Sequence, residues 1–155
     1  MRKMKCLKAL AAALLIAAML CGSALAASMG AKVVSPSMAV YNSRKQQVGT
    51  LSMGTSLKVT AYSGKWAKIS YKGNKYYAKL KDIAFDDRIK AVSIKSTPIQ
   101  FVTKSSYKRN VYYTATLSAG VTLYVAGISG SNFLFFDESG TVMGYVSKSA
   151  VRKAD

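Results

Sequence analysis

Apolar and polar residues alternate with a period of two along much of the chain, and no segment keeps the 3.6-residue period of an amphipathic helix. The run 57–62 is typical. Its residues divide between two predicted faces, with Leu57, Val59 and Ala61 opposite Lys58, Thr60 and Tyr62. Residues 66–71 alternate in the same way, and turn residues such as Gly73-Asn74 and Ser139-Gly140 separate the runs. The pattern predicts antiparallel strands joined by tight turns, and hence an all-β protein.

One fifteen-residue stretch occurs twice, at residues 50–64 (TLSMGTSLKVTAYSG) and 116–130 (TLSAGVTLYVAGISG), with eight identical positions. A second match follows between residues 75–84 and 142–151. We therefore predict two structural units. Their expected bounds are 32–84 and 96–153, with 85–95 as a linker or connecting strand. Units this small are near the lower limit for a self-sufficient core, so we expect the two to pack on each other.

Residues 133–136 (FLFF) interrupt the alternation, because four apolar residues follow one another. Such a run predicts a strand that is buried on both faces. A contact between the two units is the preferred interpretation. The alternatives are packing inside the second unit and a surface patch that binds a protein partner.

The first 26 residues have the organisation of a secretory signal peptide, with basic residues, an apolar stretch and a cleavage site after Ala26. A membrane anchor is the alternative, but the apolar run is short for a bilayer span. Lipid attachment at Cys21 is another alternative, although a small residue usually precedes such a cysteine and Leu20 stands there. We expect an exported bacterial protein, secreted or associated with the cell wall, and no transmembrane segment after removal of the signal.

The residue inventory disfavours catalysis and metal binding. The chain has no histidine, and its only cysteines, Cys6 and Cys21, lie in the predicted signal. The acid pairs 86–87 and 137–138 are adjacent in sequence, so their side chains would diverge on a strand, whereas glycosidase carboxyls converge on one bond. The second pair is interpreted as turn acids. We predict no enzyme activity, no cofactor and no metal site.

The charge balance favours an anionic partner. Without the signal, 19 basic residues face six acidic ones, a net charge of +13, of which +9 lies before residue 91 and +4 after it. A role in solubility alone is the alternative. Most of these cations are lysines, which attract anions as point charges, so a polyanionic polymer is preferred over a specific nucleic-acid sequence. Lysines also stand beside aromatic residues in the first unit, and this group gives the first candidate ligand-binding residues: Lys58, Tyr62, Trp66, Lys68, Tyr76 and Tyr77.

The lysines and the tryptophan of this group could also be purely structural. Exposed lysines on strands protect sheet edges from pairing, and Trp66 could cover one end of the unit instead of meeting a ligand.

Three segments, VGTLSMGTSLKV (48–59), SGKWAKI (63–69) and the closing GYV (144–146), resemble the bacterial SH3-like family. The resemblance covers nearly all of the chain after residue 26. Departures from the family pattern include the absence of its N-V-R strand and the presence of Asn132 where the first copy has Trp66.

The resemblance implies two tandem small SH3-like β-barrels that bind cell-wall material, often peptidoglycan cross-bridges, in proteins that frequently carry a separate hydrolase. By analogy it adds a peptide groove on exposed aromatics: Tyr41, Trp66 and Tyr77 in the first unit, and Tyr107 and Tyr145 in the second. The sequence match aligns Tyr145 with Ala78 instead of Tyr77. We predict a non-catalytic module that binds peptidoglycan or an anionic wall polymer. The alternatives are a protein-interaction or inhibitor module and a partner of a separate wall hydrolase.

Overall fold

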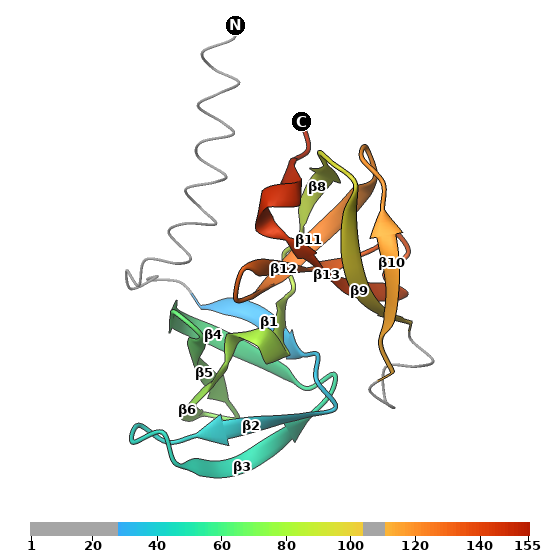
Figure 1. Ribbon diagram of the computed structural model, residues 1–155. Helices are drawn as coiled ribbons and strands as arrows, with labels where there is room; N and C mark the ends of the chain where they lie inside the picture. Colours follow the sequence, from blue (N-terminus) through green and yellow to red (C-terminus); the bar gives the residue numbers. More distant parts are fainter. Residues whose placement is uncertain (1–27, 104–110) are drawn as a thin grey trace, which may run out of the picture.

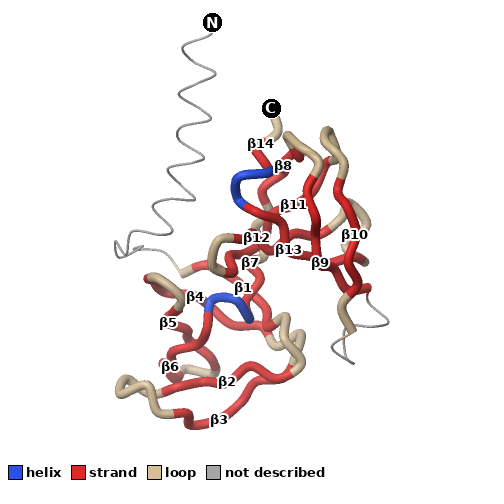
Figure 2. Tube along the Cα trace, in the orientation of Figure 1, coloured by secondary structure: helices blue, strands red, loops and turns tan. Residues whose placement is uncertain are grey.

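The structure is a computed structural model that describes residues 28–103 and 111–155. Almost all of the regular structure is strand, in two seven-stranded antiparallel sheets, with two short 3-10 helices (Figures 1 and 2). The all-β prediction is therefore confirmed. The predicted signal peptide and Tyr107 lie outside the described residues. Within the described residues, no helix is both long and apolar enough to span a membrane.

The first unit, residues 29–85, holds one sheet with the strand order β3-β2-β6-β5-β4-β1-β7. Its elements are β1 (Met29–Val33), β2 (Ser37–Tyr41), β3 (Gln47–Ser52), β4 (Ser56–Ser63), β5 (Trp66–Tyr71), β6 (Asn74–Lys79), η1 (Leu80–Asp82) and β7 (Ile83–Phe85).

The second unit, residues 89–153, repeats that order as β10-β9-β13-β12-β11-β8-β14. Its elements are β8 (Ile89–Ser93), β9 (Thr97–Thr103), β10 (Tyr113–Leu117), β11 (Thr122–Ser129), β12 (Asn132–Phe136), β13 (Val142–Ser147), η2 (Lys148–Ala150) and β14 (Val151–Lys153). Because the two strand orders are the same, each strand of the first unit has a counterpart in the second. The strand register then identifies equivalent residues in the two units.

Each sheet is open. Among the described residues, the end strands β3 and β7 are not paired with each other, and neither are β10 and β14. The closed barrels that the family resemblance implied are therefore not confirmed. The unit bounds also differ from the expected ones, because β1 begins at Met29 and β8 lies between β11 and β14 in the second sheet. Most of the segment 85–95 thus belongs to the second unit, and only residues 86–88 join the units.

The repeated motif forms the same scaffold in both units. Gly54 and Gly120 have φ values of 80° and 84°, which favour glycine, and lie in the turn before β4 and β11. Their amides donate hydrogen bonds to the carbonyl oxygens of Val33 and Ser93, at 2.9 Å and 2.8 Å, at the end of each unit's first strand. The shared glycines therefore build equivalent turns, as their recurrence in the two copies indicated.

The prediction that Tyr62 shares an exposed face with Lys58 is wrong. A β-bulge shifts the β4–β5 register between Val59 and Ala61, so the alternation changes phase at Thr60. Tyr62 consequently points into the core, is 6% exposed and packs against Phe85 at 5.9 Å between ring centroids. A bulge inserts one residue without any break in the apolar–polar pattern, so the sequence alone did not reveal the change of face.

The two units pack on each other, as their size predicted. Strand β11 contacts β7 and η1 of the first unit. Leu134, from the FLFF run, is 1% exposed and belongs to a buried cluster that also contains Val34 and Ala84 of the first unit. Phe133 and Phe135 point the other way into the main core. Burial on both faces of β12 is confirmed, and the contact between units supplies one of the two faces.

Candidate functional site

Three aromatic side chains from neighbouring strands of the first unit lie together. Tyr41 in β2 pairs with Tyr77 in β6, and β6 in turn pairs with β5, which carries Trp66. The rings of Tyr41 and Trp66 meet edge to face, with centroids 5.0 Å apart. All three side chains are partly exposed. The sheet register therefore assembles an aromatic surface from residues that are up to 36 positions apart in sequence.

Three lysines surround these rings. The ammonium group of Lys45 lies 3.2 Å from the ring centroid of Tyr77 and 4.4 Å from that of Trp66. The ammonium group of Lys79 lies 3.5 Å from the Trp66 centroid, and that of Lys68 lies 5.8 Å from the Tyr77 centroid. Such distances are favourable for cation–π attraction. We call these six residues the aromatic–lysine cluster: Tyr41, Lys45, Trp66, Lys68, Tyr77 and Lys79.

A structured loop holds Lys45 in place. The side-chain oxygen of Asn42 accepts hydrogen bonds from the amides of Arg44 and Gln46, both at 3.0 Å. The Asn42 amide side chain also donates to the side-chain oxygen of Gln46 at 3.0 Å. Lys45 itself adopts a left-handed backbone conformation, with φ of 63°. The loop between β2 and β3 is thus pinned by one asparagine, which directs Lys45 toward the rings.

The cluster has an excess of positive charge. Burial, followed by the neighbouring ammonium groups of Lys65, Lys81 and Lys45, holds the pKa of Lys79 below its usual range, against the opposing effect of Asp82. Among the described residues the only ion pair joins Arg152 and Asp155, near the C-terminus. Within that part of the chain, the cations of the cluster therefore have no carboxylate partner at ion-pair distance. A bound anion would relieve their mutual repulsion.

Two cavities adjoin the cluster. One, of about 340 Å³, is lined by Lys45, Ala61, Tyr62, Ser63, Trp66, Lys68 and Tyr77. The other, of about 570 Å³, reaches the second unit and is lined by Gly64, Lys65, Lys79, Leu80, Lys81, Ile128, Ser129 and Gly130. Lys79 lines the second cavity and also contacts Trp66, so it connects the two. We refer to these two neighbouring cavities together as the lysine groove.

The structure brings four of the predicted binding residues together: Tyr41, Trp66, Lys68 and Tyr77. Tyr76 borders a neighbouring cavity with Tyr77 but also packs against the core. Lys58 is exposed on β4, opposite Ser70, and lines none of these cavities. Tyr62 contributes to the cavity wall from the core, and its buried hydroxyl has no hydrogen-bond partner.

Tyr145 is placed differently from the predicted groove. Strand register pairs Tyr145 with Leu134 and Tyr77 with Lys68, which makes Tyr145 the counterpart of Tyr77. The alignment with Ala78 is wrong by one residue, because the turn before β13 is longer than the turn before β6. Tyr145 packs against the buried cluster at the junction. Burial, with smaller effects from Tyr112 and Asp82, raises its pKa to about 12.

The predicted binding residues left out four lysines of the site: Lys45, Lys65, Lys79 and Lys81. The last three were expected on a lysine-rich side of the first unit, on condition that its strands are neighbours, whereas Lys45 was missed. Lys45 lies in the loop that precedes β3, and no periodic pattern links it to Trp66. The segment 42–46 did carry a signal, since asparagine is favoured in turns whose backbone amides need an acceptor. The other three lysines converge only because β6, η1 and the β4–β5 turn are neighbours in the fold.

The acids form no metal-binding group in the part of the chain that the structure describes. No set of three potential metal ligands lies together there. Asp137 is a turn residue, as predicted. Its carboxylate accepts hydrogen bonds from the hydroxyl of Ser139 and the amide of Val142. Burial works against ionisation, but these hydrogen bonds dominate and hold the pKa of Asp137 below its usual value.

No protein-family model matches the chain, and no curated protein matches it. Two solved structures resemble it, NlpC1 and NlpC2 from Trichomonas vaginalis, each with a TM-score of 0.36. NlpC1 is 11% identical, and the match covers 85% of this chain and 48% of that one. For NlpC2 the values are 9%, 84% and 49%. The chain thus spans about half the length of either structure, and likeness this weak carries no argument about function.

Proposed function

We propose that this protein is a non-catalytic, exported binding protein that attaches to an anionic polymer of the bacterial cell wall through its aromatic–lysine cluster. The observation that carries the proposal is the gathering of Lys45, Lys68 and Lys79 on the rings of Trp66 and Tyr77, with no carboxylate among the described residues close enough to pair with them. Unpaired cations above partly exposed rings suit a ligand that offers both negative charge and apolar or sugar surface.

The shape of the site favours a linear polymer over a small anion. The lysine groove continues past Trp66 to Lys65 and Lys81, so positive charge extends along a path and is not confined to one point. Lysines are suited to such a ligand because their flexible ammonium groups neutralise charge without demanding a fixed geometry. A phosphate-containing wall polymer would meet several of these ammonium groups at once.

We also infer that the two units are divergent relatives of the SH3-like family. The support is the matching strand order of the two units, with the repeated glycines in equivalent turns. The family's wall-binding role, carried over by resemblance, agrees with the site. The proposal itself rests on the cluster.

The test is the binding of the purified protein to isolated bacterial cell walls at graded salt concentrations. We expect binding that weakens as salt rises, because exposed charges are screened. The double variant K45Q/K79Q should bind about tenfold more weakly, equivalent to roughly 1.4 kcal/mol. The matched control is K90Q/K153Q, which removes the same charge from exposed sites of the second unit and should bind nearly as well as the parent protein.

Three outcomes would contradict the proposal. Equal weakening by both double variants would mean that bulk charge is responsible, and salt-independent binding would exclude an electrostatic site. Undiminished binding to walls from which the phosphate polymers have been extracted would exclude the anionic polymer as the ligand. Release of soluble sugar or peptide from the walls would show that the protein is an enzyme.

A further inference from the structure

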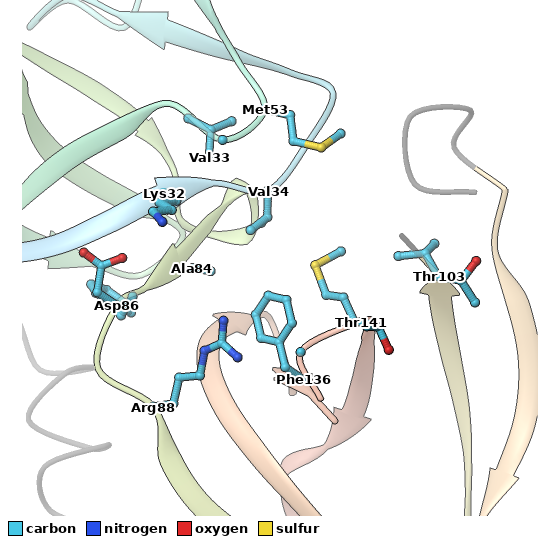
Figure 3. Close-up of a pocket in the computed structure, with 15 residues that line it drawn as sticks. Lys32, Val33, Val34, Met53, Ala84, Asp86, Arg88, Thr103, Phe136 and Thr141 are labelled. Carbon is cyan, nitrogen blue, oxygen red and sulfur yellow. The ribbon is translucent and has the colours of Figure 1, made fainter. Parts of the chain in front are cut away.

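A separate cavity of about 450 Å³ lies where the two units meet and shares no lining residue with the lysine groove (Figure 3). The first unit contributes Val34, Met53 and Ala84 to its wall, and the second contributes Val102, Phe136 and Met143. Val34, Ala84, Val102 and Met143 are buried, each at most 8% exposed. The interior is therefore apolar, and much of its wall is formed by side chains that are as buried as those of the core.

Charged groups stand at the edge of this apolar space. Arg88 extends toward Phe136, and its guanidinium carbon lies 4.1 Å from the ring centroid (Figure 3). Lys32 and Asp86 also line the cavity. None of the three forms an ion pair among the described residues. Two cations against one carboxylate leave this edge positive, and the planar donors of arginine match a carboxylate.

We propose that this cavity binds a small amphipathic carboxylate, with its apolar body against Val34, Phe136 and Met143 and its carboxylate on Arg88. The volume lies within the usual range for small-ligand sites, which combine an apolar interior with a few polar groups that fix orientation. A polyanion does not fit, because desolvating several charges against these apolar walls is costly. The site is thus independent of the wall-binding function proposed above.

A ligand in this position touches both units. Binding to the folded protein alone stabilises it by mass action, and here the added contacts span the junction. Ligand binding is therefore expected to raise the free energy needed to separate the units, as well as the free energy of unfolding of either one. This coupling gives the proposal a second readout, a rise in the midpoint of thermal unfolding with ligand concentration.

The experiment compares sodium decanoate with decanol, two probes with the same chain length and different head groups, by titration calorimetry on the purified protein. Decanoate is expected to bind with a stoichiometry of one and to raise the unfolding midpoint. Decanol should bind about tenfold more weakly, because it lacks the charge-assisted hydrogen bonds to Arg88. Equal affinity for the two probes, or no saturable decanoate binding, would overturn the proposal.

Two variants locate the site. R88M should weaken decanoate binding about tenfold and leave decanol binding unchanged, because it removes the charge and keeps an apolar stem. T141W should weaken the binding of both probes by narrowing the cavity at an exposed position. R152M is the control, since Arg152 is an exposed arginine outside the cavity. If R152M weakens decanoate binding as much as R88M does, the carboxylate is not held at this cavity.

Discussion

The two units place opposite kinds of residue at equivalent positions of the same strands. Lys68 in β5 is exposed, whereas its counterpart in β12, Leu134, is 1% exposed and packs against the first unit. Ala61 in β4 corresponds to Gly127 in β11, where the chain approaches β7 closely. The face that carries the lysine groove in the first unit is therefore the face that the second unit uses to dock.

The other side of the junction shows the reverse exchange. Ala84 and Phe85 in β7 are buried, at 6% exposure each, while their counterparts Arg152 and Lys153 in β14 are exposed. The contact is heterologous, since a surface of one unit meets a different surface of the next, and such contacts can propagate into filaments. Each surface is apolar where it is covered and charged where it is free.

This comparison indicates that the two units use the same face for different purposes. The first unit keeps Tyr77 and Lys68 available on its free face. In the second unit the equivalent pair, Tyr145 and Leu134, lies at the junction. Only the first unit therefore has a free face for the proposed wall ligand. The second unit covers apolar residues of its neighbour and contributes one wall of the groove and of the junction cavity.

The largest expected effect comes from giving the second unit the residue of the first. L134K places an ammonium group in the buried cluster at the junction, with no partner there, and should lower the free energy of unfolding by about 3 kcal/mol or more. Denaturant unfolding measures the change. The reciprocal variant K68L alters an exposed position and should change stability by less than about 0.5 kcal/mol. If L134K and K68L changed the free energy of unfolding equally, the equivalent faces of the two units would not differ in burial.

A smaller effect is expected at Gly127, where β11 closely approaches β7 of the first unit. A β-carbon on Gly127 would lie 2.8 Å from the carbonyl oxygen of Ile83 and 3.2 Å from a methyl carbon of Leu134. G127A should therefore cost about 1–3 kcal/mol by overpacking. The matched variant A61G, at the equivalent position of the first unit, should cost no more than about 1 kcal/mol, the usual penalty for glycine in a strand. If G127A instead raised the midpoint of thermal unfolding, the packing at the junction would have room for an additional methyl group.

The smallest expected change concerns Tyr62, whose counterpart in the second unit is Ile128. Its buried hydroxyl has no hydrogen-bond partner, so Y62F should stabilise the protein by about 1 kcal/mol. Burial raises the pKa of Tyr62 from 10.0 to about 12. The stability supplied by its neutral form is fully present below pH 10 and is lost as the pH rises through about 12.

The alkaline loss of stability should therefore be shallower in Y62F than in the parent protein. It should not vanish, because burial also raises the pKa of Tyr145 to about 12. Y124F is the control at a half-buried position and should change the free energy of unfolding by less than about 0.5 kcal/mol. Loss of stability in Y62F at neutral pH would indicate that the hydroxyl is satisfied in solution.

Much of the fold was predictable because it depends on local rules. Alternation of apolar and polar residues indicated the strands, and turn residues marked the glycines that adopt positive φ, including Gly73 and Gly140. The FLFF run indicated burial on both faces because four consecutive apolar residues leave no polar side for solvent. The candidate site was predictable only in part. Trp66, Lys68 and Tyr77 follow from strand patterns, whereas Lys45 lies in a loop and Tyr62 follows a bulge.

The sequence by itself determined that this protein is all-β, built twice from one scaffold and strongly basic, because period-two patterning, repeated turn residues and net charge are properties of the chain. Only the tertiary structure decided which copy of the shared face is free and which is docked. That choice depends on the approach of β11 to β7, which joins residues far apart in sequence. Tertiary packing also brings Lys79 beside Trp66 and Arg88 beside Phe136, and so creates both proposed sites.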